Sequence, residues 1–417
     1  MSPVRKLPGR KYRQERRMGI RTGCLFFILI FFAASVVSAS VSESTKKFIK
    51  GSISDKIHVV QTVELKESIP VIEKALDFVI ENTPAFGSDE DLTQLALVSV
   101  NTLPSDSKII SRIKESSQKS LSEKLMAIFK IQKDKNLRAA IMKILPAYAS
   151  ADKNLTVNFL NDYLSTAFKA DEKAENVLEQ AIVTLGTIGN QESLTIIYNI
   201  WSSKIWKEYS ASTDEALVLL SQDSFTDAIK IFSVSKIEDS AHYFSLLHKS
   251  SKISQNSLCQ IAETALLFAI NNAEKLKASG KSAERAFFDF QKETHELLAE
   301  NKWSHAYSVI NSNVILAKKS FDEGKMSESD FSSLISSATA IPSHELAQTF
   351  TDMLSECNGI LENNNRMPAK SVVLALISAL GVLGDKTAFD TLLYVSYLSY
   401  PLDVIDEAKK SLALLQW

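Results

Sequence analysis

The chain has 417 residues, of which 45% are hydrophobic and 23% are charged, so it is long enough to bury a large core. It carries 47 Lys and Arg against 49 Asp and Glu, with only 12 glycines and 9 prolines. The scarcity of turn residues argues against a sheet protein. Without residues 1–39 the net charge is about −9, which argues against a general nucleic-acid binder, because such a protein needs a basic face.

The first 39 residues have the features of an export signal. Residues 5–21 hold eight basic side chains and one acid, and residues 24–37 form an unbroken run of apolar and small residues. Small residues precede the expected cleavage point, which lies between Ala39 and Ser40. Without residues 1–39 the chain keeps 39 basic and 48 acidic side chains, a net charge of about −9.

An uncleaved membrane anchor is the alternative for the same segment. The apolar run has 14 residues, or about 16 when it is extended to Ala39, whereas a spanning helix needs about 20. We therefore expect cleavage, and association with a membrane through residues 24–39 stays open. The expected location is the periplasm, or the periplasmic face of the inner membrane.

The chain then divides into four predicted parts. Residues 40–65 are rich in Ser, Lys and Glu and predict a weakly structured linker, with an apolar patch at 57–63 that is compatible with a first helix. Helical repeats are predicted over 66–250, a divergent region of longer helices over 251–365, and a C-terminal repeat over 366–417.

Several serines have the Ser-x-x-acid spacing of a helix-starting capping box, and three of them are singled out as helix starts. They are Ser120, Ser212 and Ser327, followed three positions later by Glu123, Glu215 and Asp330. We therefore predict a helix start at each.

One short motif occurs twice, 195 residues apart. Leu-Gly-Thr-Ile-Gly-Asn at 185–190 returns as Leu-Gly-Val-Leu-Gly-Asp at 380–385. We expect the second glycine to end a helix in the left-handed conformation, the Asn or Asp to cap the next helix, and the first glycine to let two helices approach closely. The turn positions are Gly186, Gly189, Asn190, Gly381, Gly384 and Asp385.

Around this motif, three segments of the chain can be aligned as copies of one repeat unit. Six positions, called columns below, are apolar in all three copies, although the first copy lacks the glycines of the turn. Four columns fall on one helix face before the turn, and two fall on one face after it. The aligned residues are Leu137, Val177 and Val372; Ile141, Ala181 and Leu376; Met142, Ile182 and Ile377; Leu145, Leu185 and Leu380; Val157, Ile197 and Leu392; and Leu160, Ile200 and Val395.

This pattern, in units of about 40 residues, resembles the HEAT-like repeat (α-solenoid) family, here as an exported bacterial member. The matches span 172–203 and 368–414, with the degenerate copy at 135–165, about a quarter of the chain. The resemblance implies an all-α fold, an α-solenoid of stacked antiparallel helix pairs with a divergent middle region of longer helices, and a role in holding other macromolecules.

No motif in the sequence indicates a reaction, a cofactor or a metal. His-Glu pairs at His295 and His344 lack the second histidine that zinc binding on one helix face requires, and Gly-Lys-Ser at 280–282 lacks the earlier glycine of a P-loop. Pairing of Cys259 with Cys357 is open, although two separate buried thiols are favoured. We therefore predict no catalytic, cofactor-binding or metal site.

Four aromatic residues provide the one candidate for a binding site. Tyr198, Trp201, Trp206 and Tyr209 lie in or just after the second helix of the best repeat copy. Trp201 occupies the position that Ser396 holds in the C-terminal copy, so the repeat core does not require it. We predict that the cluster anchors a protein partner, since Trp and Tyr dominate binding hot spots; the alternative is packing against the next repeat.

The sequence therefore predicts a non-catalytic, exported helical-repeat scaffold that mediates protein–protein interaction in the bacterial envelope, without a cofactor and without nucleic acid. Two alternatives stay open. One is a membrane-anchored structural or envelope-assembly factor, and the other is an enzyme.

Overall fold

The structure, a computed structural model, describes residues 42–86, 89–149, 152–173, 175–223, 225–278 and 280–416. Over these residues it contains 22 α-helices and no strand, which confirms the predicted all-α class. The expected export signal, its apolar run and the cleavage point between Ala39 and Ser40 lie outside the described residues.

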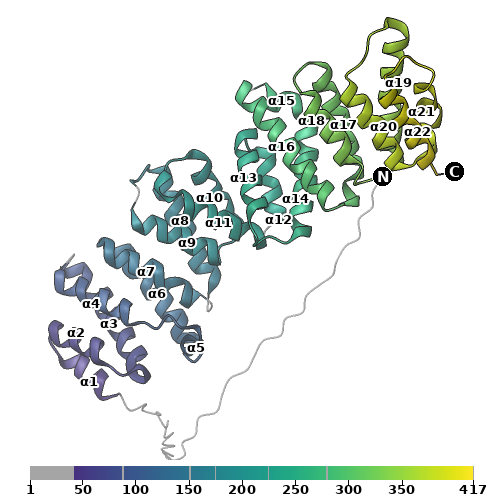
Figure 1. The fold of residues 1–417 in the computed structure, drawn as a ribbon. Helices are drawn as coiled ribbons and strands as arrows, with labels where there is room; N and C mark the ends of the chain where they lie inside the picture. The colour runs from purple at the N-terminus through teal and green to yellow at the C-terminus, as the bar shows by residue number, and fades with distance from the viewer. Residues whose placement is uncertain are drawn as a thin grey trace, which may run out of the picture. The chain divides into compact units, whose positions relative to one another are not determined.

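The helices follow one another with short connections (Figure 1). The N-terminal ones are α1 (Glu43–Lys50), α2 (Ile53–Thr62), α3 (Leu65–Phe86), α4 (Glu90–Thr102), α5 (Ser107–Ile110), α6 (Glu115–Ile131), α7 (Lys135–Tyr148), α8 (Lys153–Lys169), α9 (Asn176–Ile188), α10 (Gln191–Ser203), α11 (Ser210–Asp223), α12 (Phe225–Val234) and α13 (Ile237–Lys249), with the 3-10 helix η2 (Lys207–Tyr209) before α11.

The C-terminal helices are α14 (Gln255–Asn271), α15 (Ala273–Lys277), α16 (Lys281–Glu300), α17 (Tyr307–Asp322), α18 (Glu328–Ala338), α19 (His344–Asn364), α20 (Lys370–Leu383), α21 (Phe389–Val395) and α22 (Leu402–Leu414). The 3-10 helices η3 (Ser304–Ala306) and η4 (Lys386–Ala388) precede α17 and α21. In the region predicted to have longer helices, the lengths range from 5 residues in α15 to 21 in α19, while α3 outside it has 22 residues.

The six aligned apolar columns form part of the hydrophobic core. All eighteen residues are buried, and the most exposed of them, Val372, has only 4% of its surface accessible. A helix whose apolar residues recur every three or four positions buries one face, and that face must meet another helix to leave water. The periodicity read from the sequence thus identifies buried positions in all three copies.

Each helix packs mainly against helices that are near it in the chain. For example, α9 contacts α7, α8 and α11, and α20 contacts α18, α19 and α22. Helices on the two sides of the boundaries predicted near residues 250 and 365 also pack on each other. Helix α13 contacts α16, and α18 contacts α20. The residues from Glu43 onward accordingly form one compact unit.

The first glycine of each turn lets two helices approach closely, as predicted. A Cβ atom on Gly186 would lie 2.9 Å from the Cα and Cβ atoms of Ala216 on α11. A Cβ atom on Gly381 would lie 2.6 Å from the Oγ of Ser411 on α22. Since real Cβ atoms do not approach this closely, both positions require glycine, and the partner in each case is the helix two positions further along.

The capping residues also take their predicted roles. The Asn190 side chain accepts a hydrogen bond from the backbone N–H of Ser193 at 3.1 Å and begins α10. Asp385 accepts from the backbone N–H of Thr387 at 2.9 Å and begins η4, which leads into α21.

The second glycine behaves differently in the two copies. Gly384 has φ +67°, the expected left-handed conformation, but Gly189 has φ −64°, so the prediction for Gly189 is wrong. Glycine is still required at 189 for a steric reason, since a Cβ atom there would lie 2.3 Å from the carbonyl oxygen of Leu185 and 2.7 Å from Leu220. The same residue type therefore serves two different backbone geometries.

Of the three predicted capping boxes, only the one at Ser327 begins a helix. Ser327 accepts from the backbone N–H of Asp330 at 3.1 Å. Ser120 and Ser212 instead lie inside α6 and α11, so those two predictions are wrong. Ser212 donates its hydroxyl hydrogen to Glu179 at 2.7 Å, which shows that a serine with capping spacing can serve an interhelical bond instead.

The predicted weakly structured linker is also wrong, because α1 and α2 occupy most of it and pack on α3 and α4. This segment buries Phe48 and Val60, and Lys56 is buried beside them with its charge satisfied. Its buried ammonium donates to the carbonyl oxygen of Gly51 at 2.5 Å and lies 4.9 Å from the centre of the Phe78 ring. A buried lysine satisfied in this way does not interrupt the apolar contact around it.

Within the described part of the chain, no helix is long and apolar enough to cross a membrane.

Candidate functional site

The structure brings the four predicted aromatic residues into one region but gives them different environments. Tyr198 and Trp201 lie on one face of α10, three positions apart. Trp206 lies in the connection that follows, and Tyr209 ends η2. Helices α11 and α13 complete the surroundings, through Asp214 and His242 among others.

Trp201 is partly exposed, and contacts with neighbouring side chains hold it in place. Its indole N–H donates to Asp214 Oδ1 at 2.7 Å, which joins α10 to α11. Its ring centre lies 4.9 Å from that of His242 on α13 and 5.6 Å from that of Tyr198. Three neighbours therefore hold one ring whose remaining surface faces solvent.

Tyr198 and Trp206 are buried, so they support the site from within. Trp206 is 3% exposed and donates its indole N–H to the carbonyl oxygen of Glu172 at 2.9 Å. Tyr198 bonds Ser235 Oγ at 2.5 Å, and burial raises the pKa of its hydroxyl to about 12. Tyr209 is half-buried, and burial is the main cause that raises its pKa.

A cavity of about 290 Å³ opens beside Trp201, and we name it the Trp201 pocket. Its lining combines apolar and aromatic side chains with two lysines and two aspartates. Burial raises the pKa of the Asp239 carboxyl. The lining residues are Ile200, Trp201, Lys204, Trp206, Lys207, Ser210, Thr213, Asp214, Asp239 and His242.

The pocket has the chemistry of a small recognition site. A single apolar or aromatic side chain could contact the Trp201 ring while its flanking polar groups meet Lys204, Lys207 or Asp239. Its geometry depends on the sequence locally. Lys204 ends α10 in the left-handed conformation (φ +57°), and the chain that follows places Trp206 in the lining of the same pocket.

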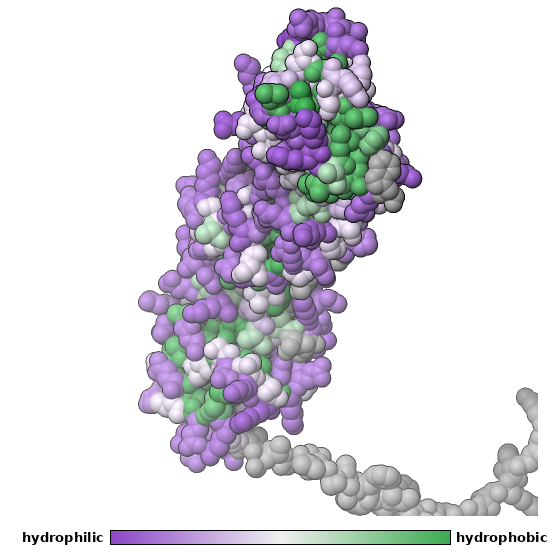
Figure 2. All heavy atoms as spheres, turned by 45° about the vertical axis from the view of Figure 1, so that its right-hand side comes forward, coloured by the Kyte–Doolittle hydropathy of each residue, from purple (hydrophilic) through white to green (hydrophobic). Residues whose placement is uncertain are grey.

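Hydrophobic side chains also gather on the surface of the C-terminal helices, at the upper end of Figure 2. Val382, Tyr397, Leu402 and Leu414 are 58–78% exposed. The sequence analysis did not identify this feature, because Val382 belongs to a helix that is apolar on nearly every side. Apolar periodicity cannot separate its exposed face from its buried one.

The groups that could carry chemistry are dispersed over the described residues. Those residues contain no cluster of three His, Cys, Asp or Glu side chains that could hold a metal ion. Cys259 and Cys357 are separate buried thiols, and burial raises the pKa of Cys357 to about 11. His344 bonds Asp385 at 2.7 Å, and this hydrogen bond raises the pKa of the imidazole. The predicted lack of catalysis stays a prediction.

The sequence analysis also missed a buried polar cluster formed by Gln291, His295 and Asn313. These residues come from α16 and α17 and are at most 1% exposed. No local spacing signals the cluster, because its central residue lies on a different helix from the other two.

No protein-family model matches this chain, and a search of curated proteins finds no match either.

Proposed function

We propose that this chain is an exported, non-catalytic scaffold of the HEAT-like kind, an α-solenoid of stacked antiparallel helix pairs that binds a protein partner at the Trp201 pocket. Two observations support the architecture. Helices contact the neighbours next and next but one in the chain, and the aligned columns are buried in every copy. Helical repeats of this kind bury their apolar faces only by stacking, and the surface that results is commonly used for binding.

The partial exposure of Trp201 is the main observation that supports the proposed binding role. Tyr198 and Trp206 on the same segment are buried, so packing explains them. Trp201 keeps solvent-facing surface although its N–H is already satisfied by Asp214. A rigid, pre-oriented indole beside a pocket loses little side-chain entropy on binding, which is the property of an interface anchor.

Residues 1–39 determine where the scaffold acts. Cleavage after Ala39 places it in the periplasm, whereas a retained apolar run over residues 24–39 makes it a membrane-anchored envelope-assembly factor. Sequencing the N-terminus of the protein purified from its own cells separates these two cases. A chain that begins at Ser40 supports the soluble scaffold, and a chain that keeps residues 24–39 supports the anchored alternative.

The binding role is tested with variants of Trp201 in the full chain. Trp201→Ala and wild-type protein are each used to capture partners from an envelope fraction, and the captured proteins are compared by quantitative mass spectrometry. Trp303→Ala is the matched control, because Trp303 is also half-exposed and also donates its indole N–H to a carboxylate, Glu263 Oε2, at 2.7 Å.

The expected result is a specific partner that binds wild-type protein and Trp303→Ala and is reduced about tenfold or more by Trp201→Ala, the loss typical of a hot-spot residue. Equal capture by all three proteins contradicts the proposed site. Circular dichroism of each variant establishes that the helices are retained, so that a loss of capture reports on the surface.

A further inference from the structure

A second cavity, of about 180 Å³, lies between α16 and the segment formed by α18 and the loop that precedes it. Gln291 and His295 form part of its α16 side, together with Phe288. Met326 and Leu334 form part of the opposite side. This α16–α18 cavity is distinct from the Trp201 pocket and shares no lining residue with it.

Three buried polar side chains behind this cavity form a hydrogen-bonded series. Gln291 donates its Nε2–H to Asn313 Oδ1 at 2.7 Å, and Asn313 Nδ2 lies 3.0 Å from His295 Nδ1. The two atoms at the ends of the series, Gln291 Oε1 and His295 Nε2, have no hydrogen-bond partner among the described residues. A buried polar group without a partner destabilises the fold, so such a pair indicates a site that a ligand can satisfy.

The series fixes the chemistry of its two ends. Burial lowers the pKa of His295 to about 4, so its ring is neutral and carries one N–H. With Asn313 donating to Nδ1, the N–H is at Nε2, and the ends are then one donor, Nε2–H, and one acceptor, Gln291 Oε1. Reversing the amides of both Asn313 and Gln291 together with the His295 tautomer exchanges these two roles but still leaves one donor and one acceptor.

Both ends belong to residues of α16 that line the cavity. Gln291 and His295 are four residues apart on α16, so their side chains lie side by side on one face of the helix. A group that joins an acceptor to a donor within one plane can bridge them. The primary carboxamide has this arrangement, with a carbonyl oxygen beside an NH₂ group.

The charged residues around the cavity favour a neutral ligand. Lys292 lies 3.8 Å from Asp330, and Lys325 is paired with Glu323 at 2.7 Å and with Glu284 at 3.8 Å. An anionic ligand would compete with these partners for the lysines and would find only a neutral imidazole inside. A neutral ligand leaves the pairs in place.

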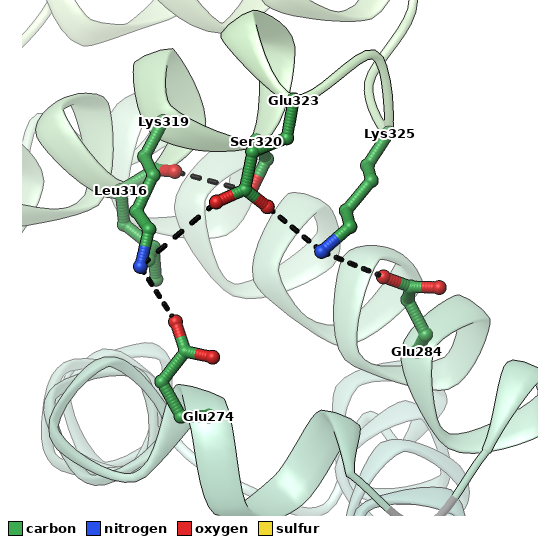
Figure 3. A network of polar contacts seen from close by, with 7 residues as sticks. All are labelled: Glu274, Glu284, Leu316, Lys319, Ser320, Glu323 and Lys325. Carbon is green, nitrogen blue, oxygen red and sulfur yellow. Dashed lines mark hydrogen bonds and ion pairs between the residues drawn. The ribbon is translucent and has the colours of Figure 1, made fainter.

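A network of ion pairs holds the loop that forms one side of the cavity (Figure 3). Lys319 on α17 lies 2.7 Å from Glu274 on α15, and Glu323 lies between Lys319 and Lys325. The backbone N–H groups of Lys325 and Met326 also donate to the carbonyl oxygen of Ser320. Two backbone hydrogen bonds therefore hold the loop on one side of the cavity, and the exposed ion pairs add a smaller contribution.

We propose that the α16–α18 cavity binds a primary carboxamide, which bridges the free ends of the Gln291–Asn313–His295 series and places its carbon body against Phe288, Met326 and Leu334. The carboxamide comes either from a small molecule or from a Gln or Asn side chain of a peptide. The two sources share this chemistry, and the experiment includes one probe of each kind.

The test follows the imidazole nitrogens of the full chain by ¹⁵N NMR while a probe is added. Benzamide represents the small molecule, and N-acetylglutamine N-methylamide represents the peptide side chain. Acetophenone, which lacks the NH₂ group, and benzoate, which is anionic, are the matched comparison ligands. The expected result is a saturable shift of the His295 nitrogens with at least one carboxamide, and binding of both comparison ligands that is weaker by about tenfold or more.

Two variants complete the test. Gln291→Leu removes one end of the series and should weaken carboxamide binding about tenfold. Ser336→Ala, at an exposed residue of α18 outside the cavity lining, should leave binding within about twofold. Equal binding of benzamide and acetophenone, or no saturable shift with either carboxamide, overturns the proposal and leaves water as the occupant. If Gln291→Leu does not fold, the ligand series on the wild-type protein decides alone.

Discussion

The Trp201 pocket and the α16–α18 cavity are built on the same kind of helix packing but differ in how their buried polar atoms are paired. At the Trp201 pocket the polar atoms of the aromatic residues are satisfied internally, since Trp201 donates to Asp214 and Trp206 to Glu172. At the α16–α18 cavity the series that begins at Gln291 and ends at His295 has an unpaired atom at each end. The first surface can select a partner by shape and apolar contact, and the second by hydrogen bonding.

The largest predicted difference is in folding stability: replacing the buried Trp206 should destabilise the protein more than replacing the partly exposed Trp201. Trp206→Ala should lower the free energy of unfolding by about 4 kcal/mol, because it removes a buried indole and leaves a cavity. Trp201→Ala should cost about half as much, since part of its ring is already exposed. Urea denaturation of the full chain measures both. Equal losses contradict the division between support and binding surface.

At the α16–α18 cavity, Asn313→Leu should lower the free energy of unfolding by about 3 kcal/mol. The variant removes the centre of the series and leaves Gln291 Nε2 and His295 Nδ1 without their partner. A triple variant, Gln291→Leu with Asn313→Leu and His295→Phe, should recover most of this loss, because no buried polar group is left unpaired. If the single and triple variants are equally unstable, packing volume and not hydrogen bonding governs the cavity.

The pH dependence of stability should also differ between the two sites. The folded pKa of His295 is about 4, below its ordinary value of 6.5, so the unfolded chain binds the proton more readily. His295 therefore stabilises the fold fully above pH 6.5, and this contribution is lost as the pH falls towards 4, by about 3 kcal/mol. His295→Gln should lose less stability over this range than wild-type protein. Identical pH profiles contradict a buried neutral imidazole.

The smallest predicted change is Trp201→Phe. This variant keeps an aromatic ring at the pocket but loses the N–H that bonds Asp214, so stability should fall by about 1 kcal/mol. Partner capture should be retained more fully than with Trp201→Ala. If Trp201→Phe captures as little partner as Trp201→Ala, the indole N–H and not the aromatic ring is responsible for partner binding.

Sequence periodicity predicted the buried positions well because it reflects a local rule. The same leucine position recurs in the three copies, as Leu145, Leu185 and Leu380. Each of these residues lies one helical turn from another apolar residue, and all three are buried. The close approach at Gly186 and Gly381 was predicted for the same reason, since a glycine within an apolar helix indicates contact with a neighbour.

Features that depend on residues distant in the sequence were not predictable in this way. Gly189 avoids the left-handed conformation, and glycine is needed there partly because Leu220 of another helix leaves no room for a Cβ atom. The spacing of the aromatic residues could not show that Trp206 is buried and Trp201 is not. His295 resembled one half of a metal motif, whereas its actual partner is Asn313 on α17.

A photo-crosslinking amino acid placed at Lys207, an exposed residue of the Trp201 pocket, tests the proposed role most directly. Lys275 on α15, an exposed lysine far along the chain, is the matched control position. The account predicts one main adduct with an envelope protein from position 207, absent from position 275 and abolished when Trp201→Ala is added. The same adduct from both positions, or one that persists in Trp201→Ala, contradicts it.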